Sequence, residues 1–177
     1  MRVLAIVLMM MAAVSTGAAA ETLSIKSFYG HFVGRGSASS VTAGYFDISE
    51  RDLEVTIKAA GTGVQVAWTT YINKGGAGDA QKIVKRSTKI TFGATGKPNV
   101  FIEKRGTDPF DGTPLSWARI EGRTLSTYTF VVDKDGVYNL ATYNRTLDKQ
   151  GRVMDLQFEA LRNGVVVRSA GAKLVRK

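Results

Sequence analysis

Three arginines that stand beside aromatic or acidic residues have the clearest potential for chemistry: Arg51, Arg119 and Arg145. Trp117 lies two residues before the second of them, and Tyr143 lies two residues before the third. A guanidinium group grips a carboxylate or a phosphate through two parallel hydrogen bonds. Arginines pointing into an enclosed space would therefore form a cationic lining for an anionic head group. The alternative is that they lie at exposed strand ends and form surface ion pairs.

Other reactive residue types are scarce. The sequence has one histidine, His31, and no cysteine, so it supplies no multi-histidine metal site, no disulfide and no thiolate nucleophile. A lone imidazole favours an exposed or rim position over a metal or haem ligand. The stretch 133–136 lacks the closing glutamate of a calcium loop, and a hairpin turn explains it better. We therefore predict a protein that is not an enzyme and uses no cofactor and no metal.

The first twenty residues have the three-part layout of a secretory signal peptide. Arg2 is followed by an apolar run over residues 3–14 and then by small residues up to Ala20. The run is too short for a membrane-spanning helix, which needs about twenty apolar residues. We expect cleavage after Ala20, a single domain over 21–177, and a periplasmic or secreted location. No later stretch is long and apolar enough to span a bilayer as a helix.

Positive charge predominates, with 24 Lys and Arg against 15 Asp and Glu and a formal net charge of +9. One of these positive charges, on Arg2, belongs to the expected signal peptide. Such a balance favours anionic partners. In an exported protein these would be lipid head groups or polysaccharides, so we expect no nucleic-acid partner.

Alternation of apolar and polar residues dominates the rest of the sequence. Leucine, valine, isoleucine and alanine occupy every second position over residues 53–59, and a similar pattern returns over 64–72. This period of two predicts strands with one buried face. Turn signals at 61–63, 134–136 and 163–164 predict three hairpins. The further strand candidates are 28–36, 44–48, 83–92, 100–104, 117–120, 125–132, 137–143, 153–161 and 165–167. The predicted fold class is all-β, a single antiparallel meander closing into a barrel of about 8–10 strands.

The first of these strands resembles the opening strand of lipocalins and related calycin barrels. In those barrels a glycine two residues before a large aromatic closes the barrel base, and Gly30 and Phe32 occupy these places here. The resemblance also implies an arginine of the last strand stacked on the aromatic ring, a part assigned to Arg168. Segments 51–55, 66–70, 114–119 and 143–147 are similar to a family of small uncharacterised exported bacterial proteins, which implies no particular activity.

The leading hypothesis is a lipocalin-like protein that holds a small apolar or amphipathic ligand, with an anionic head group as one option. Trp68 and Trp117, which are first of all core candidates, would supply apolar contact, and Arg119 or Arg145 would clamp the head group. One alternative is a ligand-free module that docks on anionic envelope lipid or polysaccharide through its basic surface. Another is an outer-membrane barrel, against which the charges on the predicted strand faces argue.

Overall fold

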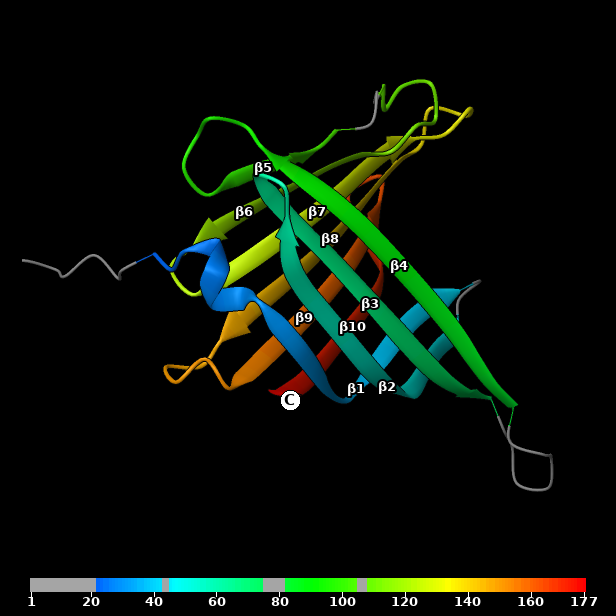
Figure 1. Ribbon diagram of the computed structural model, residues 1–177. Helices are drawn as coiled ribbons and strands as arrows, with labels where there is room; N and C mark the ends of the chain where they lie inside the picture. Colours follow the sequence, from blue (N-terminus) through cyan, green and yellow to red (C-terminus); the bar gives the residue numbers. More distant parts are fainter. Residues whose placement is uncertain (1–21, 43–44, 75–81, 105–107) are drawn as a thin grey trace, which may run out of the picture.

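The predicted strands form a closed antiparallel barrel (Figure 1). The computed structural model describes residues 22–42, 45–74, 82–104 and 108–177; the expected signal peptide, 1–20, lies outside them. Within these residues a short 3-10 helix, η1 (Ile25–Phe28), precedes ten strands. They are β1 (Gly30–Thr42), β2 (Tyr45–Ala60), β3 (Gly63–Lys74), β4 (Lys82–Ala94), β5 (Val100–Glu103), β6 (Leu115–Glu121), β7 (Thr124–Val132), β8 (Tyr138–Leu147), β9 (Val153–Arg162) and β10 (Val165–Arg176).

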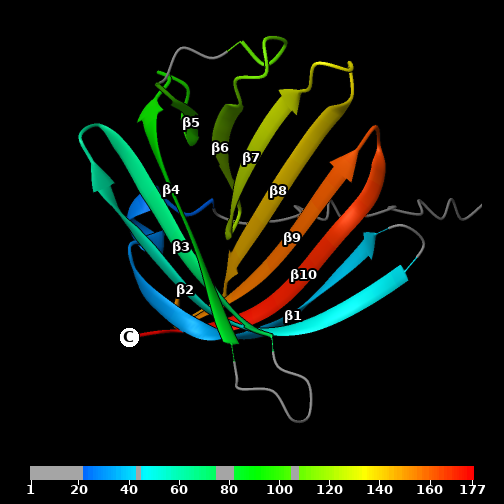
Figure 2. The same cartoon turned by 90° about the vertical axis from the view of Figure 1, so that its right-hand side faces the viewer.

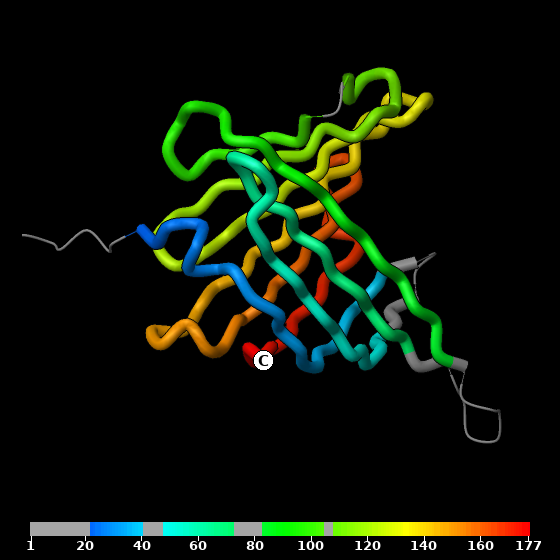
Figure 3. The backbone as a smooth tube through the Cα atoms, in the orientation of Figure 1, coloured from blue at the N-terminus to red at the C-terminus, as the bar shows by residue number. Residues whose placement is uncertain are grey.

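Each strand pairs with the next along the chain, and β10 returns to pair with β1. This closing seam runs from Phe32 opposite Arg176 to Ser40 opposite Arg168. Figure 2 shows β8, β9 and β10 side by side in chain order, and the tube in Figure 3 follows the meander from blue to red. The ring of strands is closed, but β5 pairs with only three residues of β4, Phe92 to Ala94, so the rest of β4 has no partner on that side among the described strands. The predicted all-β meander is thus confirmed, with ten strands.

Several predicted strand boundaries differ from the structure. Segments 45–48 and 53–59 belong to one long strand, β2, because the ladder with β1 continues through the polar residues between them. Phe28 lies in η1 rather than in the first strand, which begins at Gly30. In the described part of the chain, no helix is long and apolar enough to cross a membrane.

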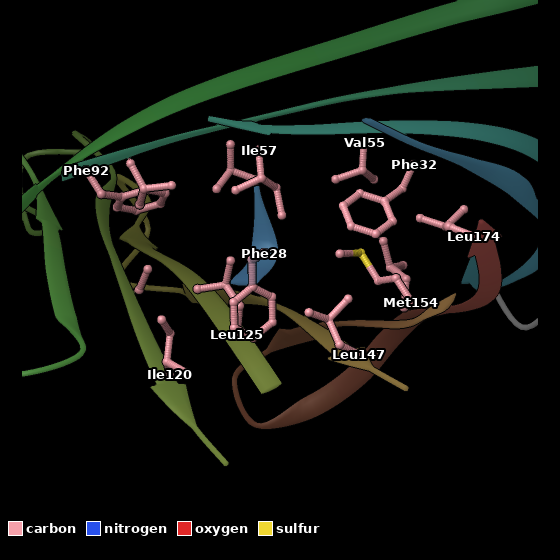
Figure 4. Close-up of a cluster of buried hydrophobic side chains, with 14 of the residues drawn as sticks. Phe28, Phe32, Val55, Ile57, Phe92, Ile120, Leu125, Leu147, Met154 and Leu174 are labelled. Carbon is pink, nitrogen blue, oxygen red and sulfur yellow. The ribbon is translucent and has the colours of Figure 1, made fainter. Parts of the chain in front are cut away.

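The hydrophobic core fills one end of the barrel, which we call the base. The base carries η1 and the turns that join β2 to β3, β6 to β7 and β8 to β9; the opposite end is the mouth. In the base, Phe32, Met154 and Leu174 lie together (Figure 4), and all three are fully buried. The other buried members of the core are Phe28, Val55, Ile57, Val64, Val66, Phe92, Phe101, Ala118, Ile120, Leu125, Leu147 and Leu156.

An arginine at the end of the chain closes this base. The guanidinium of Arg176 lies 4.6 Å from the centre of the Phe32 ring. It donates hydrogen bonds to the carbonyl oxygens of Ser27 and Gly151, each at 2.8 Å, and to that of Tyr29. One side chain therefore ties β10 to the segment before β1 and to the turn between β8 and β9.

The stacked arginine is Arg176 and not Arg168, so that assignment needs correction. The last strand extends to Arg176, well beyond the predicted 165–167, and its register sets Arg176 opposite Phe32. Arg168 lies at the other end of the seam. Gly30 has a φ of 147°, and a Cβ there would come within 2.9 Å of the Arg176 guanidinium. A glycine at this position therefore lets the arginine approach the backbone closely.

Candidate ligand-binding site

A cavity of about 160 Å³ lies inside the barrel on the mouth side of the core. Its walls come from β1, β2, β3, β4, β8, β9 and β10. Gly36, Ala170 and Ala172 are three of these lining residues. Below the cavity, Leu156 belongs both to the lining and to the core. The space is therefore a pocket with a closed apolar floor.

Three aromatic rings form that floor across the width of the barrel. The ring centres of Trp68 and Tyr143 are 4.8 Å apart, and those of Tyr143 and Phe158 are 4.5 Å apart. Trp68 belongs to β3 and Tyr143 to β8, and these strands lie on opposite sides of the closed sheet. Their contact therefore spans the lumen and separates the cavity from the core. Tilted ring pairs at such distances are favourable packing arrangements.

Arg145 packs against this floor from the side of the core and is fully buried. Its guanidinium carbon lies 5.3 Å from the centre of the Trp68 ring and 5.1 Å from that of Tyr143. Nη1 donates a hydrogen bond of 2.9 Å to Oγ1 of Thr127. Nε and Nη2 have no hydrogen-bond partner among the described residues. The largest fully buried side chain is thus a cation with one ordinary hydrogen bond.

This environment penalises the charge on Arg145. Burial lowers the pKa of its guanidinium to about 10, and the nearby Tyr143 opposes that change. An unpaired buried charge is costly, and buried polar groups almost always have partners. The two aromatic faces recover part of the cost through cation–π attraction. An acceptor that reached Nε and Nη2 would recover more.

The walls above the floor are electropositive. Arg51, Arg86 and Arg168 line the cavity, and no aspartate or glutamate does so among the described residues. Arg51 also donates to Oγ of Ser49, at 3.2 Å from Nη2. Burial raises the pKa of the Tyr143 phenol, although the positive charges of the neighbouring arginines act in the opposite direction. Burial therefore disfavours the phenolate form of Tyr143 despite the arginines nearby.

Of the four side chains predicted to bind a ligand, the structure brings Trp68 and Arg145 together. Trp117 and Arg119 lie on the outer surface, because the buried residue between them, Ala118, faces inward. Trp117 stacks on Tyr128 with ring centres 4.9 Å apart. Arg119 is exposed and pairs with a glutamate of its own strand at 3.2 Å. Neither outer residue reaches the cavity.

Sequence reasoning missed three members of the site. Phe158 and Arg86 were not predicted to bind a ligand, and Arg168 was assigned to the base. The alternation itself was the available signal, since residues 168, 170, 172 and 174 share one face of β10. His31 is exposed on the outer face, with Nδ1 at 3.1 Å from Oγ1 of Thr56, away from all these groups.

No protein-family model matches the chain, and no curated protein matches its sequence.

Proposed function

We propose that this is an exported, lipocalin-like binding protein that holds one small apolar or amphipathic ligand on the mouth side of its core. One observation carries the proposal: a barrel with a packed base leaves a cavity above an aromatic floor. A site lined mostly by apolar and aromatic groups, with a few polar groups that converge on it, is typical of small-molecule binding. The protein acts by binding and not by catalysis.

Binding of a neutral fluorescent probe tests this function, whatever the charge of the natural ligand. N-phenyl-1-naphthylamine should bind the purified protein with increased emission, and native mass spectrometry should show a co-purified small molecule. Trp68→Ala should weaken probe binding at least tenfold because it opens the floor of the cavity. Trp117→Ala is the matched control, since this ring lies outside, and it should leave binding unchanged. Equal effects of the two substitutions, or no probe binding at all, would refute the proposal.

The proposed export has its own test. Expressed with residues 1–20 in a bacterium with two membranes, the protein should appear in the periplasm or medium, and its first residue should be Glu21. A protein that keeps Met1 and stays in the cytoplasm would contradict the export proposal while leaving the binding proposal intact.

A second candidate function rests on the charge of the base. Lys26, Lys149, Arg152 and Lys177 are exposed there, around the point where Arg176 joins η1 to the turn between β8 and β9. This cluster could dock the barrel on an anionic envelope lipid or polysaccharide. Sedimentation with phosphatidylglycerol vesicles should then weaken steeply with added salt. Reversing three lysine charges at the base should abolish it, and salt-independent sedimentation would exclude this mode.

A further inference from the structure

Arginines of increasing burial lead from the mouth to the floor of the barrel. Arg86 and Arg168 are exposed, Arg51 is partly buried, and Arg145 is fully buried. The described lining contains these arginines and no carboxylate, so the lining residues themselves give the space a positive potential. A low-dielectric wall concentrates such a potential and draws anions inward. The gradient in burial gives the attraction a direction, toward Arg145.

The unpartnered atoms of Arg145 have the geometry of a particular acceptor. Nε and Nη2 share one edge of the planar guanidinium, and this edge binds a carboxylate side-on through two parallel hydrogen bonds. The opposite side of the group is already occupied, because Nη1 donates to Thr127. A single carboxylate would therefore satisfy both remaining nitrogen atoms at once. Two separate neutral acceptors would satisfy the hydrogen bonds but leave the buried charge without a counter-ion.

The volume of the cavity and the cost of burying charge restrict the chemical class of the ligand further. A volume of about 160 Å³ corresponds to roughly five water-sized groups at about 30 Å³ each, so the part of the ligand inside the pocket is short. A second negative charge would enter the apolar floor with no buried cation to pair with it, which is costly. The rings of Trp68 and Phe158 offer apolar surface next to the acid.

From these observations we infer that the ligand is an amphipathic monocarboxylic acid that enters head first and places its carboxylate on Nε and Nη2 of Arg145. Its apolar body lies against the aromatic floor and its tail extends toward the mouth. This inference rests on the proposed binding function and adds the chemical class and the orientation of the ligand.

Binding of this kind requires a ring to move. Nε and Nη2 have almost no exposed surface, and the rings of Trp68 and Tyr143 lie between the guanidinium and the cavity. A carboxylate that reaches Arg145 must turn at least one of these rings aside. The environment of Trp68 therefore changes on binding, which its fluorescence reports.

Three eight-carbon ligands with different head groups test the inference: octanoate, 1-octanol and monooctyl phosphate. The protein has two tryptophans, so the Trp117→Phe variant carries Trp68 as its sole tryptophan. Octanoate should bind at least 100-fold more tightly than 1-octanol, since a buried bidentate charge pair is worth about two orders of magnitude. It should also shift the Trp68 emission. Monooctyl phosphate should bind more weakly than octanoate.

Substitutions at Arg145 identify the residue responsible. Arg145→Met should reduce octanoate affinity about 100-fold and leave 1-octanol affinity unchanged, while Arg145→Lys should retain part of the preference. Arg119→Met removes an outer arginine as the matched control and should change neither. The comparison of octanoate with 1-octanol in the unsubstituted site needs no variant to fold.

The outcomes separate the two proposals. Equal affinities for octanoate and 1-octanol, or an octanoate affinity unaffected by Arg145→Met, would overturn the carboxylate assignment while the binding function stands. Tighter binding of monooctyl phosphate would overturn it in favour of a phosphate head group. If neither these three ligands nor N-phenyl-1-naphthylamine bind, the binding function itself fails.

Discussion

Replacing Arg145 by methionine should change the stability of the ligand-free barrel by no more than about 2 kcal/mol, although it removes the largest of the described fully buried side chains. Burial lowers the pKa of Arg145 to about 10. At 1.36 kcal/mol for each tenfold change in an ionisation constant, keeping this charge inside costs about 3 kcal/mol of folding free energy at neutral pH. Methionine has a similar reach and no charge, so the substitution removes this cost.

Two losses oppose that gain. The hydrogen bond to Thr127 disappears and leaves a buried hydroxyl unpaired, at about 1 kcal/mol. The cation–π contacts with Trp68 and Tyr143 are worth between about 0.5 kcal/mol each, the value at exposed sites, and about 2 kcal/mol each when desolvated, as they are here. The net expectation therefore lies between a gain of about 1 kcal/mol and a loss of about 2 kcal/mol. By contrast, Leu125→Ala, an ordinary truncation in the core, should cost about 2–5 kcal/mol.

The pH dependence distinguishes the charge from the shape of the side chain. The folded pKa of Arg145 is lower than the unfolded one, so above pH about 10 the unfolded chain holds the proton more tightly than the folded protein does. This residue's contribution to stability therefore rises with pH above about 10. The stability of Arg145→Met relative to the original protein should be constant below pH 10 and fall above it.

Urea unfolding of delipidated protein at pH 7, followed by circular dichroism, measures the free energy of unfolding of the original and substituted proteins. A loss of more than about 2 kcal/mol in Arg145→Met would show that the guanidinium stabilises the folded barrel. The expectation that burying this charge lowers stability would then be wrong. A neutral or favourable change together with lost octanoate binding is what a functional residue kept at the expense of stability should show.

Three further changes test the framework of the barrel, each by urea or thermal unfolding. Arg176→Ala should cost about 3 kcal/mol because three carbonyl groups at the base lose a charged donor, whereas the exposed Arg168→Ala should change stability by less than about 0.5 kcal/mol. Gly34→Ala should cost about 1–3 kcal/mol or prevent folding because its Cβ would collide with the backbone of β10, while Gly171→Ala meets no atom within 4 Å and should be tolerated. Asp148→Ala should lower the melting temperature at pH 7, and the difference should vanish in acid, because hydrogen bonds from the backbone of the β8–β9 turn lower the pKa of this carboxyl and their benefit is lost as it protonates.

The sequence was most informative where one face of a strand is clearly apolar. Residues 53–59 and 64–72 alternate so regularly that the strands, their inward faces and the turn between them follow from the pattern alone. The same pattern places Trp68 on the inside. It carries no information about what lies across the barrel, so the contact between Trp68 and Tyr143 could not be read from it.

The faces of β6 could not be assigned in advance. Its inward face carries Ser116, Ala118 and Ile120, while the outward face carries Leu115 and Trp117. Hydrophobicity therefore does not identify the inward face, because Trp117 packs on Tyr128 outside the barrel. The register of the closing seam between β1 and β10 could not be predicted from the sequence either. Which arginine of β10 meets Phe32 depends on how ten staggered strands close, and no local pattern encodes that sum.

The last strand, β10, ends at the base of the barrel. The backbone N–H of Lys177 donates a hydrogen bond of 2.9 Å to the carbonyl oxygen of His31, so Lys177 is held at the base, at the end opposite the mouth. A tag, fluorophore or surface tether attached after Lys177 would therefore hold every molecule with its opening toward the solution. Uptake could then be measured on an oriented layer without hindering ligand entry.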